Sequence, residues 1–232
     1  QEKIEAFLRE WQNGEDYIVA HTSGSTGTPK EIHLQKSDMI HSARLTNGFF
    51  GITSVSKLYL CLSPDYVAGK MMIVRALEAK AKLFSENPSN RPLSENQSND
   101  VYDLVAVVPS QAQWLVTHPE CKHRVRNLLV GGGVLPDKTR LQLAESGIRA
   151  YLSYGMTETC SHVALSEIAR DKKPFKAMSG IHFEVDNRGC IVIEAPEFTY
   201  HRLVTNDIVD LISPTTFFWR GRYDNVINTG GI

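Results

Sequence analysis

The sequence lacks the features of a membrane, secreted or nucleic-acid-binding protein. No run approaches the roughly 18 continuous apolar residues of a membrane span. The first residues, Gln1 to Lys3, have neither the basic nor the apolar part of a secretory signal. Neither sign of charge dominates, because 25 Lys and Arg oppose 26 Asp and Glu. Without a global field to attract nucleic acid or an acidic membrane, we expect small-molecule partners.

Cysteine is also scarce. The four cysteines, Cys61, Cys121, Cys160 and Cys190, lie far apart and form no C-x-x-C pair. This spacing fits neither a disulfide framework nor a zinc site. Free thiols in a reducing compartment fit best, and we therefore expect a cytoplasmic protein.

The 232 residues contain enough apolar material, 42%, to bury a substantial core. Up to about residue 175, apolar runs alternate with segments of helical spacing. This order predicts a parallel sheet covered by helices. Strands are expected at 17–20, 58–62, 81–84, 104–108, 128–130 and 150–152, and helices at 4–11, 37–49, 68–79, 110–116 and 137–146.

Two stretches break this rhythm. Residues 85–100 are almost all polar, with Leu93 the sole aliphatic side chain, which predicts a solvated loop or linker. Beyond about residue 176, short alternating runs at 181–185, 191–194, 208–212 and 217–219 predict a small antiparallel β-barrel-like subdomain. The expected fold is thus α/β, with an α/β region at 1–175 followed by a β-rich subdomain at 176–224.

The segment Thr22–Lys30, TSGSTGTPK, follows a predicted buried strand and is suited to binding phosphate. Its two glycines allow backbone N–H groups to face a ligand, its hydroxyls add donors, and Lys30 adds charge. Because Pro29 precedes the lysine and no Ser or Thr follows it, this is not a Walker A loop. The alternative is a flexible polar linker.

Five segments in order resemble the adenylate-forming enzymes, the family of acyl-CoA and aryl-CoA ligases, luciferases and nonribosomal adenylation domains. His21–Ile32 is similar to the family's phosphate loop, and 131–136, GGGVLP, to its adenine-side glycine turn. The others are 153–159 (SYGMTET), 205–207 (TND) and 219–227 (WRGRYDNVI). The departures from the family pattern are Asn206 in place of Gly and Asn225 in place of Asp.

The resemblance implies a MgATP site. Lys30 and the loop hydroxyls would hold the β- and γ-phosphates, Glu158 would hold Mg²⁺, and Asp207 would accept the ribose hydroxyls. The implied catalytic residues are Lys30, Thr157 and Glu158. The implied nucleotide-binding residues are Thr22, Ser23, Gly24, Ser25, Thr26, Gly27, Gly131, Gly132, Gly133, Tyr154, Gly155, Met156, Asp207 and Arg222. The alternatives are a solvated acid at Glu158, a turn residue at Asp207 and a surface charge at Arg222.

Within the family, the chain looks most like the branch that joins 2-succinylbenzoate to coenzyme A in menaquinone biosynthesis. That acid carries a second carboxylate, which needs a cation or several donors once it leaves water. The candidates are Lys70, Arg75, Ser110, Ser161 and His162. The alternatives are a solvated Lys70, an ion pair of Arg75 with Glu78, and a structural hydrogen-bonding role for His162. Trp114 and Trp219 are expected in the core.

The resemblance also implies an incomplete acid–thiol ligase. Family members continue past a hinge, here Asp224, into a small domain that supplies a catalytic lysine, whereas no Lys follows Lys176 in this chain. Residues 225–232 would be the start of that hinge. Coenzyme A would be the co-substrate, and a homodimer is compatible with this interpretation. The alternatives are another acyl- or aryl-acid adenylating enzyme and a non-catalytic ATP-binding module.

Overall fold

The computed structural model describes residues 2–21, 31–94 and 98–225. Its helices are α1 (Glu2–Gln12), α2 (Lys36–Phe50), α3 (Val67–Ala79), α4 (Pro109–Thr117), α5 (Pro119–Lys122) and α6 (Asp137–Ala144), with short 3-10 turns η1 (Thr157–Thr159) and η2 (Tyr223–Asn225). The first strands are β1 (Tyr17–His21), β2 (Glu31–Gln35), β3 (Lys57–Leu60), β4 (Lys82–Ser85), β5 (Leu104–Val107), β6 (Asn127–Val130) and β7 (Arg149–Gly155). The remaining strands are β8 (His162–Glu167), β9 (Phe175–Ala177), β10 (His182–Val185), β11 (Cys190–Ala195), β12 (His201–Ser213) and β13 (Thr216–Arg222).

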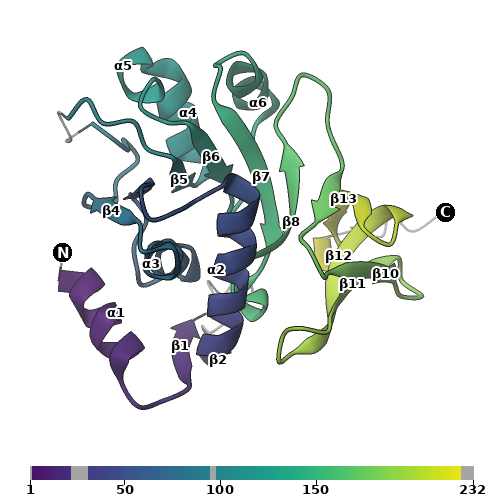
Figure 1. Cartoon of the computed structure of the whole chain (residues 1–232). Coiled ribbons are helices and arrows are strands. Elements are labelled where there is room, and N and C mark those ends of the chain that lie inside the picture. The colour runs from purple at the N-terminus through teal and green to yellow at the C-terminus, as the bar shows by residue number, and fades with distance from the viewer. Residues whose placement is uncertain (1, 22–30, 95–97, 226–232) are drawn as a thin grey trace.

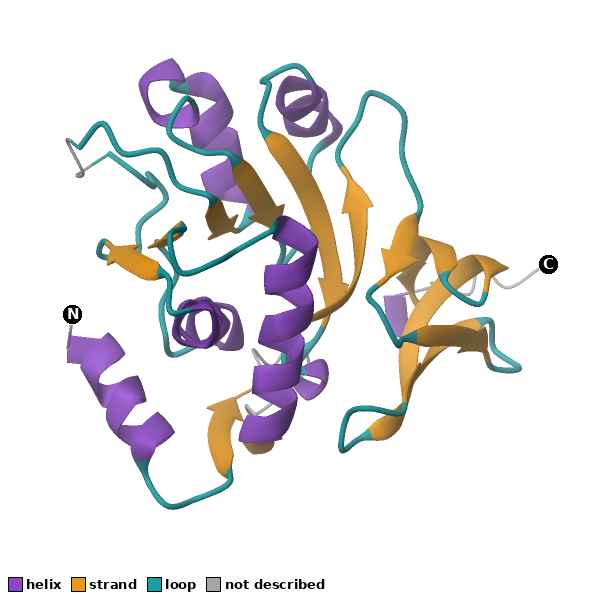
Figure 2. Cartoon of the chain, in the orientation of Figure 1, coloured by secondary structure: helices purple, strands orange, loops and turns teal. Residues whose placement is uncertain are grey.

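Eleven of these strands form one sheet, in the order β10-β11-β12-β13-β9-β8-β7-β6-β5-β3-β4 (Figures 1 and 2). The five at one end, β4, β3, β5, β6 and β7, pair in parallel. From β8 onward every pairing is antiparallel. The expected fold class, a helix-covered parallel sheet followed by antiparallel strands, is confirmed.

Two hydrophobic cores lie on the two faces of the parallel half. Along β3 and the residue that follows it, Leu58 and Leu60 belong to one core, whereas Tyr59 and Cys61 belong to the other. This alternation follows from the period of two in a strand, and it explains why these strands are apolar throughout. Residues of α2 and α3 complete the first core, and residues of α4 and α6 complete the second.

The antiparallel half begins earlier than the change in sequence pattern at residue 176. β8 pairs with β7 in the register Tyr154↔Ala164, and β9 connects β8 to β13. Neither β8 nor β9 was expected from the sequence. The division into domains at residue 176 stays a prediction, because the hydrogen-bonded sheet continues across that boundary.

Other local expectations change in the structure. The strand predicted at 17–20 forms, but it pairs antiparallel with β2 in a separate two-stranded sheet. The short helix α5 was not expected. Leu93, placed in a solvated loop, is 2% exposed and packs in the second core. A loop residue with an apolar side chain can thus anchor an otherwise polar segment.

Three parallel strands end at the same edge of the sheet. β5 ends at Val107, β6 at Val130 and β7 at Gly155, and the amide of Gly131 donates to the carbonyl of Val107 (3.0 Å). Ligands of α/β sheets bind beyond the carboxyl ends of the strands, so this edge is where a site is expected. Within the described residues, no helix is long and apolar enough to cross a membrane.

Candidate functional site

The predicted phosphate loop, residues 22–30, lies outside the described residues, and with it the predicted roles of Thr22 to Gly27 and Lys30. The strands on either side of it are described. β1 and β2 pair in the register Ala20↔Ile32, so the strands that flank this segment lie side by side. β2 then leads directly into α2 at Lys36.

The glycine turn at 131–133 lies against β7. A Cβ atom at Gly131 would lie 2.4 Å from Ser153 Oγ, so a larger residue here would have to displace that hydroxyl. Gly132 has φ +78°, a conformation that favours glycine. Ser153 Oγ also donates to the carbonyl of Val130 (3.2 Å). The turn and the strand end therefore form one tightly packed edge.

The segment after β7 folds into a compact turn. A Cβ at Gly155 would lie 2.1 Å from the carbonyl oxygen of Ser161, so this backbone approach also requires glycine. Thr159 Oγ1 accepts from the amide of Met156 (3.0 Å), and Thr157 and Glu158 stand in η1 between them. Glu158 is exposed and lines a hollow of about 270 Å³ together with Asp38, Cys160 and residues of β2.

Asp207 is joined to this segment by a buried hydrogen bond. Tyr154 Oη donates to Asp207 Oδ2 at 2.8 Å, which connects β7 to β12. Burial and the charge of Asp207 both raise the pKa of Tyr154, so its hydroxyl stays protonated. Arg222 lies opposite Asp207 in the β12–β13 register, and its guanidinium donates to Asp224 (3.2 Å). The structure thus joins Tyr154, Asp207 and Arg222, and it places Gly131 against Ser153, the residue before Tyr154.

Asn206, which replaces the family's glycine, has partners that glycine could not have. Its Oδ1 accepts from Arg188 Nη1 (2.8 Å), and its Nδ2 donates to Asp224 Oδ2 (3.3 Å). Arg188 is also paired with Asp186 (2.7 Å). The substitution therefore adds contacts between β12 and η2. Sequence reasoning noted Asn206 but missed Arg188, for which no family motif gave a signal.

Arg75, Ser161 and His162, all predicted to contact the acid, do lie together. Arg75 Nη2 donates to Ser161 Oγ at 2.6 Å, and Ser161 Oγ lies 3.3 Å from His162 Nδ1. Arg75 is 1% exposed, and complete burial lowers its pKa to about 10. Within the described residues it has no carboxylate partner, and its Nε is buried without a hydrogen bond.

The alternative pairing of Arg75 with Glu78 is wrong. Glu78 Oε2 instead accepts from Arg44 Nε at 2.8 Å. His162 is 6% exposed, and burial together with the charge of Arg75 lowers its pKa well below 6.5. Both Arg75 and His162 are therefore buried groups whose charged forms are disfavoured by their surroundings.

The other two predicted acid-binding residues lie elsewhere. Lys70 is buried, not solvated, and its Nζ lies 3.4 Å from Glu10 Oε2 and 5.0 Å from the ring centroid of Phe7. Ser110 is exposed at the start of α4 and donates to Asn90 (3.2 Å). Arg75 is thus the predicted cation without a carboxylate partner in the described part of the chain.

The two tryptophans, both expected in the core, are buried to different extents. Trp114 is partly buried, packs against the second core, and stacks on His118 with ring centroids 3.4 Å apart. Trp219 is 38% exposed on β13 and is not a core residue. A short segment of alternating pattern does not reveal which of its two faces is covered.

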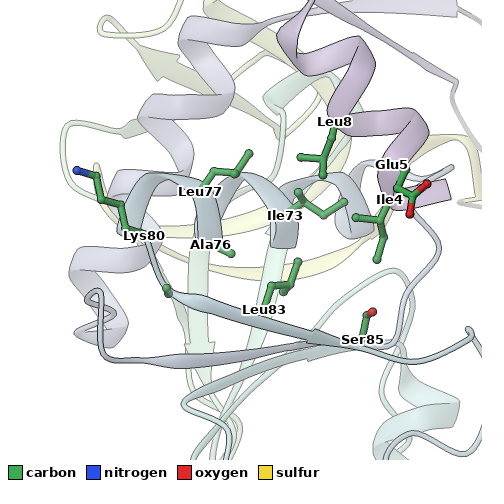
Figure 3. Close-up of a pocket in the computed structure, with 10 residues that line it drawn as sticks. Ile4, Glu5, Leu8, Ile73, Ala76, Leu77, Lys80, Leu83 and Ser85 are labelled. Atoms are coloured by element: carbon green, nitrogen blue, oxygen red, sulfur yellow. The ribbon is translucent and has the colours of Figure 1, made fainter. Parts of the chain in front are cut away.

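An open apolar groove lies between α1, α3 and β4. Ile4 and Leu8 of α1 face Ile73 and Leu77 of α3 across a volume of about 610 Å³ (Figure 3). The groove is lined by none of the predicted site residues that the structure describes. It is therefore separate from the candidate site.

The donor set at Glu158 fits Mg²⁺ only in part. Among the described residues no group of three or more His, Cys, Asp or Glu side chains is placed to hold a metal. One exposed carboxylate suits a Mg²⁺ ion that takes its other ligands from substrate phosphates and water. The four cysteines, all described, are free and buried, and burial raises the pKa of the Cys160 thiol to about 12.

The chain belongs to the AMP-binding enzyme family, whose sequence pattern matches residues 5–186. The resemblance found in the sequence is confirmed at that level. The 2-succinylbenzoate--CoA ligase of Enterococcus faecalis is 34% identical over 155 residues, covering 62% of this chain and 31% of that protein. The protein of the same name from Bacillus subtilis is 26% identical over 163 residues, covering 69% and 33%. The chain thus spans about a third of the length of these relatives.

Solved structures of other proteins have the same fold as this chain. An acyl-CoA synthetase (AMP-forming)/AMP-acid ligase II-like protein from Dyadobacter fermentans matches with a TM-score of 0.84 and 34% identity, over 98% of this chain and 66% of that one. The O-succinylbenzoate coenzyme A synthetase of Bacillus subtilis, solved with ATP and magnesium, matches with a TM-score of 0.78 and 20% identity, over 92% and 51%.

Proposed function

We propose that this chain forms the MgATP- and acid-binding part of an acid–thiol ligase whose acid is 2-succinylbenzoate. The observation that carries the proposal is Arg75, a buried guanidinium that no described carboxylate neutralises, placed beside the Gly155 turn. Burying an unpaired charge costs several kcal/mol, roughly, unless a partner arrives. A carboxylate of the substrate is such a partner.

A chain of contacts among the described residues supports the nucleotide site. Gly131 packs on Ser153, its neighbour Tyr154 bonds Asp207, and Asp207 lies opposite Arg222. Asp207 would accept the ribose hydroxyls, and Arg222 would donate to ribose or phosphate oxygens. Thr157 and Glu158 would face the phosphates from η1. Mg²⁺ held by Glu158 would neutralise charge on the departing pyrophosphate.

The proposed reaction needs no nucleophile from the protein. The carboxylate of the acid attacks the α-phosphorus of ATP, which forms an acyl-adenylate and releases pyrophosphate. The thiol of coenzyme A then attacks the acyl carbon and displaces AMP. The protein's contribution is to hold the carboxylate and the α-phosphate in line and to stabilise developing charge.

The position of Arg75 supports an acid with two carboxylates. Its partner Ser161 lies against Gly155, at the turn that would hold the α-phosphate, so one carboxylate can face ATP while the other reaches Arg75. A fatty acid would leave the guanidinium unpaired. The similarity to proteins named 2-succinylbenzoate--CoA ligase supports the same substrate.

Binding measurements on paired variants test the proposal. With ATP or a non-hydrolysable analogue present, wild-type protein should bind 2-succinylbenzoate more tightly than benzoate. Arg75→Met should remove that preference, with a loss of about 1.5 to 3 kcal/mol for the missing charged hydrogen bonds. Lys70→Met is the matched control, because Lys70 already has Glu10 as its partner. If Lys70→Met has the larger effect, Arg75 is the wrong cation; equal binding of both acids by wild type overturns the substrate.

The described site also fits a non-catalytic ATP-binding module, the second candidate. That function predicts ATP binding without acid-dependent release of pyrophosphate, whereas the ligase predicts release that depends on the acid. A cytoplasmic location is supported by the four free, buried cysteines and stays part of the proposal. The homodimer stays a prediction.

A further inference from the structure

A continuous hydrogen-bonded chain connects Arg75 to helix α2. Arg75 Nη2 donates to Ser161 Oγ (2.6 Å), because a guanidinium can only donate. On the other side of Ser161, His162 Nδ1 lies 3.3 Å away, and His162 Nε2 lies 3.2 Å from Thr46 Oγ1. Thr46, Arg75 and His162 are buried and Ser161 is partly buried, so water does not readily replace these bonds.

Thr46 determines which group donates and which accepts in each of these hydrogen bonds. Its hydroxyl donates to the carbonyl of Ser42, four residues earlier in α2, at 3.0 Å. A hydroxyl has one hydrogen, so Thr46 Oγ1 must accept from His162 Nε2–H. His162 is then the neutral Nε2–H tautomer, and its bare Nδ1 accepts the hydrogen of Ser161. Ser161 Oγ is left as a pure acceptor toward Arg75.

The other protonation states of His162 satisfy fewer groups. With the proton on Nδ1, Thr46 would have to give its hydrogen to Nε2 and abandon Ser42, while Ser161 Oγ would have no acceptor for its own hydrogen among the described residues. With both nitrogens protonated, a second positive charge would stand beside Arg75. Burial and Arg75 both lower the pKa of His162, which opposes that form.

The main chain of Arg75 is held by the residue next to Thr46. Asn47 Nδ2 donates to the carbonyl oxygen of Arg75 at 2.9 Å. Two consecutive residues of α2 therefore hold Arg75. Asn47 binds its main-chain carbonyl directly, and Thr46 is connected to its guanidinium through His162 and Ser161. A long side chain with an unpaired Nε needs such support, because a free arginine loses rotamer entropy when it is fixed.

We propose that Thr46 is a positioning residue, which orients the Arg75 guanidinium through His162 and Ser161 for the second carboxylate of the acid. The proposal rests on the proposed function for the identity of the ligand. The orientation itself is a property of the free protein and can be measured without any ligand.

Nitrogen NMR of the His162 ring and of the Arg75 side chain tests the orientation. Wild type should show a protonated Nε2 and an unprotonated Nδ1, with slow exchange of the Arg75 guanidinium protons. Thr46→Val removes the acceptor at constant shape and should mix the tautomers and speed that exchange. Thr46→Ser should restore both signals. Thr117→Val is the control, since Thr117 makes the same type of bond to a helix carbonyl (Gln113, 3.1 Å) but is exposed on α4.

Binding then connects the orientation to the acid. Thr46→Val should weaken 2-succinylbenzoate about tenfold, as for one lost hydrogen bond, and leave benzoate and ATP unchanged. A protonated His162 Nδ1 in the wild-type protein would overturn the role of Thr46. So would a Thr46→Val variant whose NMR signals and acid binding equal those of wild type. If the wild-type protein binds 2-succinylbenzoate and benzoate equally, the proposed substrate is wrong. The NMR measurement alone then tests whether Thr46 orients Arg75.

Discussion

The hydroxyl of Tyr154 donates to Asp207 Oδ2 across 2.8 Å in a buried setting, although the two residues are 53 positions apart. This bond connects β7, the last strand of the parallel half of the sheet, to β12 in the antiparallel half. The two motifs that resemble phosphate- and ribose-binding segments are thereby held in one arrangement before any nucleotide binds. Preorganisation of this kind reduces the entropy lost on binding.

Asp207→Ala should weaken ATP by about 1.5 to 3 kcal/mol, the usual cost of losing hydrogen bonds to a charged group. Tyr154→Phe removes the bond between the two residues but keeps the carboxylate, so its effect on ATP should be smaller. Isothermal titration calorimetry measures both. Unchanged affinity in Asp207→Ala would remove this residue from the nucleotide site.

Gly131→Ala should destabilise the protein by about 1 to 3 kcal/mol, since overpacking at a close contact has this size. The added Cβ would lie 2.4 Å from Ser153 Oγ, and the nearest other atom is Ser153 Cβ at 3.7 Å. The double variant Gly131→Ala/Ser153→Ala should therefore recover most of the lost stability. Urea denaturation of the single and double variants gives the comparison, and strictly additive losses would show that the serine is not the obstacle.

Acid should destabilise the chain in part through His162. Its pKa in the folded protein lies well below 6.5, because of burial and the charge of Arg75, so on acidification the unfolded chain takes up a proton that the folded protein refuses. The contribution is fully present above pH 6.5 and is lost as the pH falls below that value toward the folded pKa. The slope due to this residue reaches up to about 1.4 kcal/mol per pH unit.

Denaturation curves recorded from about pH 7.5 to about pH 5 measure this slope. His162→Gln should lessen it, because the buried ring is then absent. Equal slopes in wild type and His162→Gln would show that the ring takes up its proton equally in the folded and unfolded states.

Arg75→Met should leave the ligand-free protein as stable as wild type or stabilise it by up to about 4 kcal/mol, because an unpaired buried charge is replaced by an apolar side chain of similar length. Arg44→Met, which breaks an exposed pair with Glu78, should change stability by less than about 1 kcal/mol. Thermal and urea unfolding without ligand provide the test. A loss of several kcal/mol in Arg75→Met would mark the residue as structural.

The sequence by itself determined the longer helices and the parallel strands. The amphipathic spacing at 37–49 predicts α2 almost to its ends, and apolar runs such as 104–108 predict the buried strands, because these patterns are local and repeat with a fixed period. The order of five short motifs was also sufficient to predict the family. Local periodicity and short motifs can be read from neighbouring residues, so they can be recognised without knowledge of the fold.

The tertiary structure alone decided which partners the charged and polar groups have. Glu78, three residues after Arg75, pairs with Arg44, while Arg75 reaches Ser161, 86 residues away. Lys70 forms an ion pair with Glu10 of α1. The strands β8 and β9 form because neighbouring strands supply their hydrogen bonds. Thr46 belongs to no motif. The reason is physical: these contacts depend on how each helix is turned toward the sheet, which is set by packing of the whole core and not by local pattern.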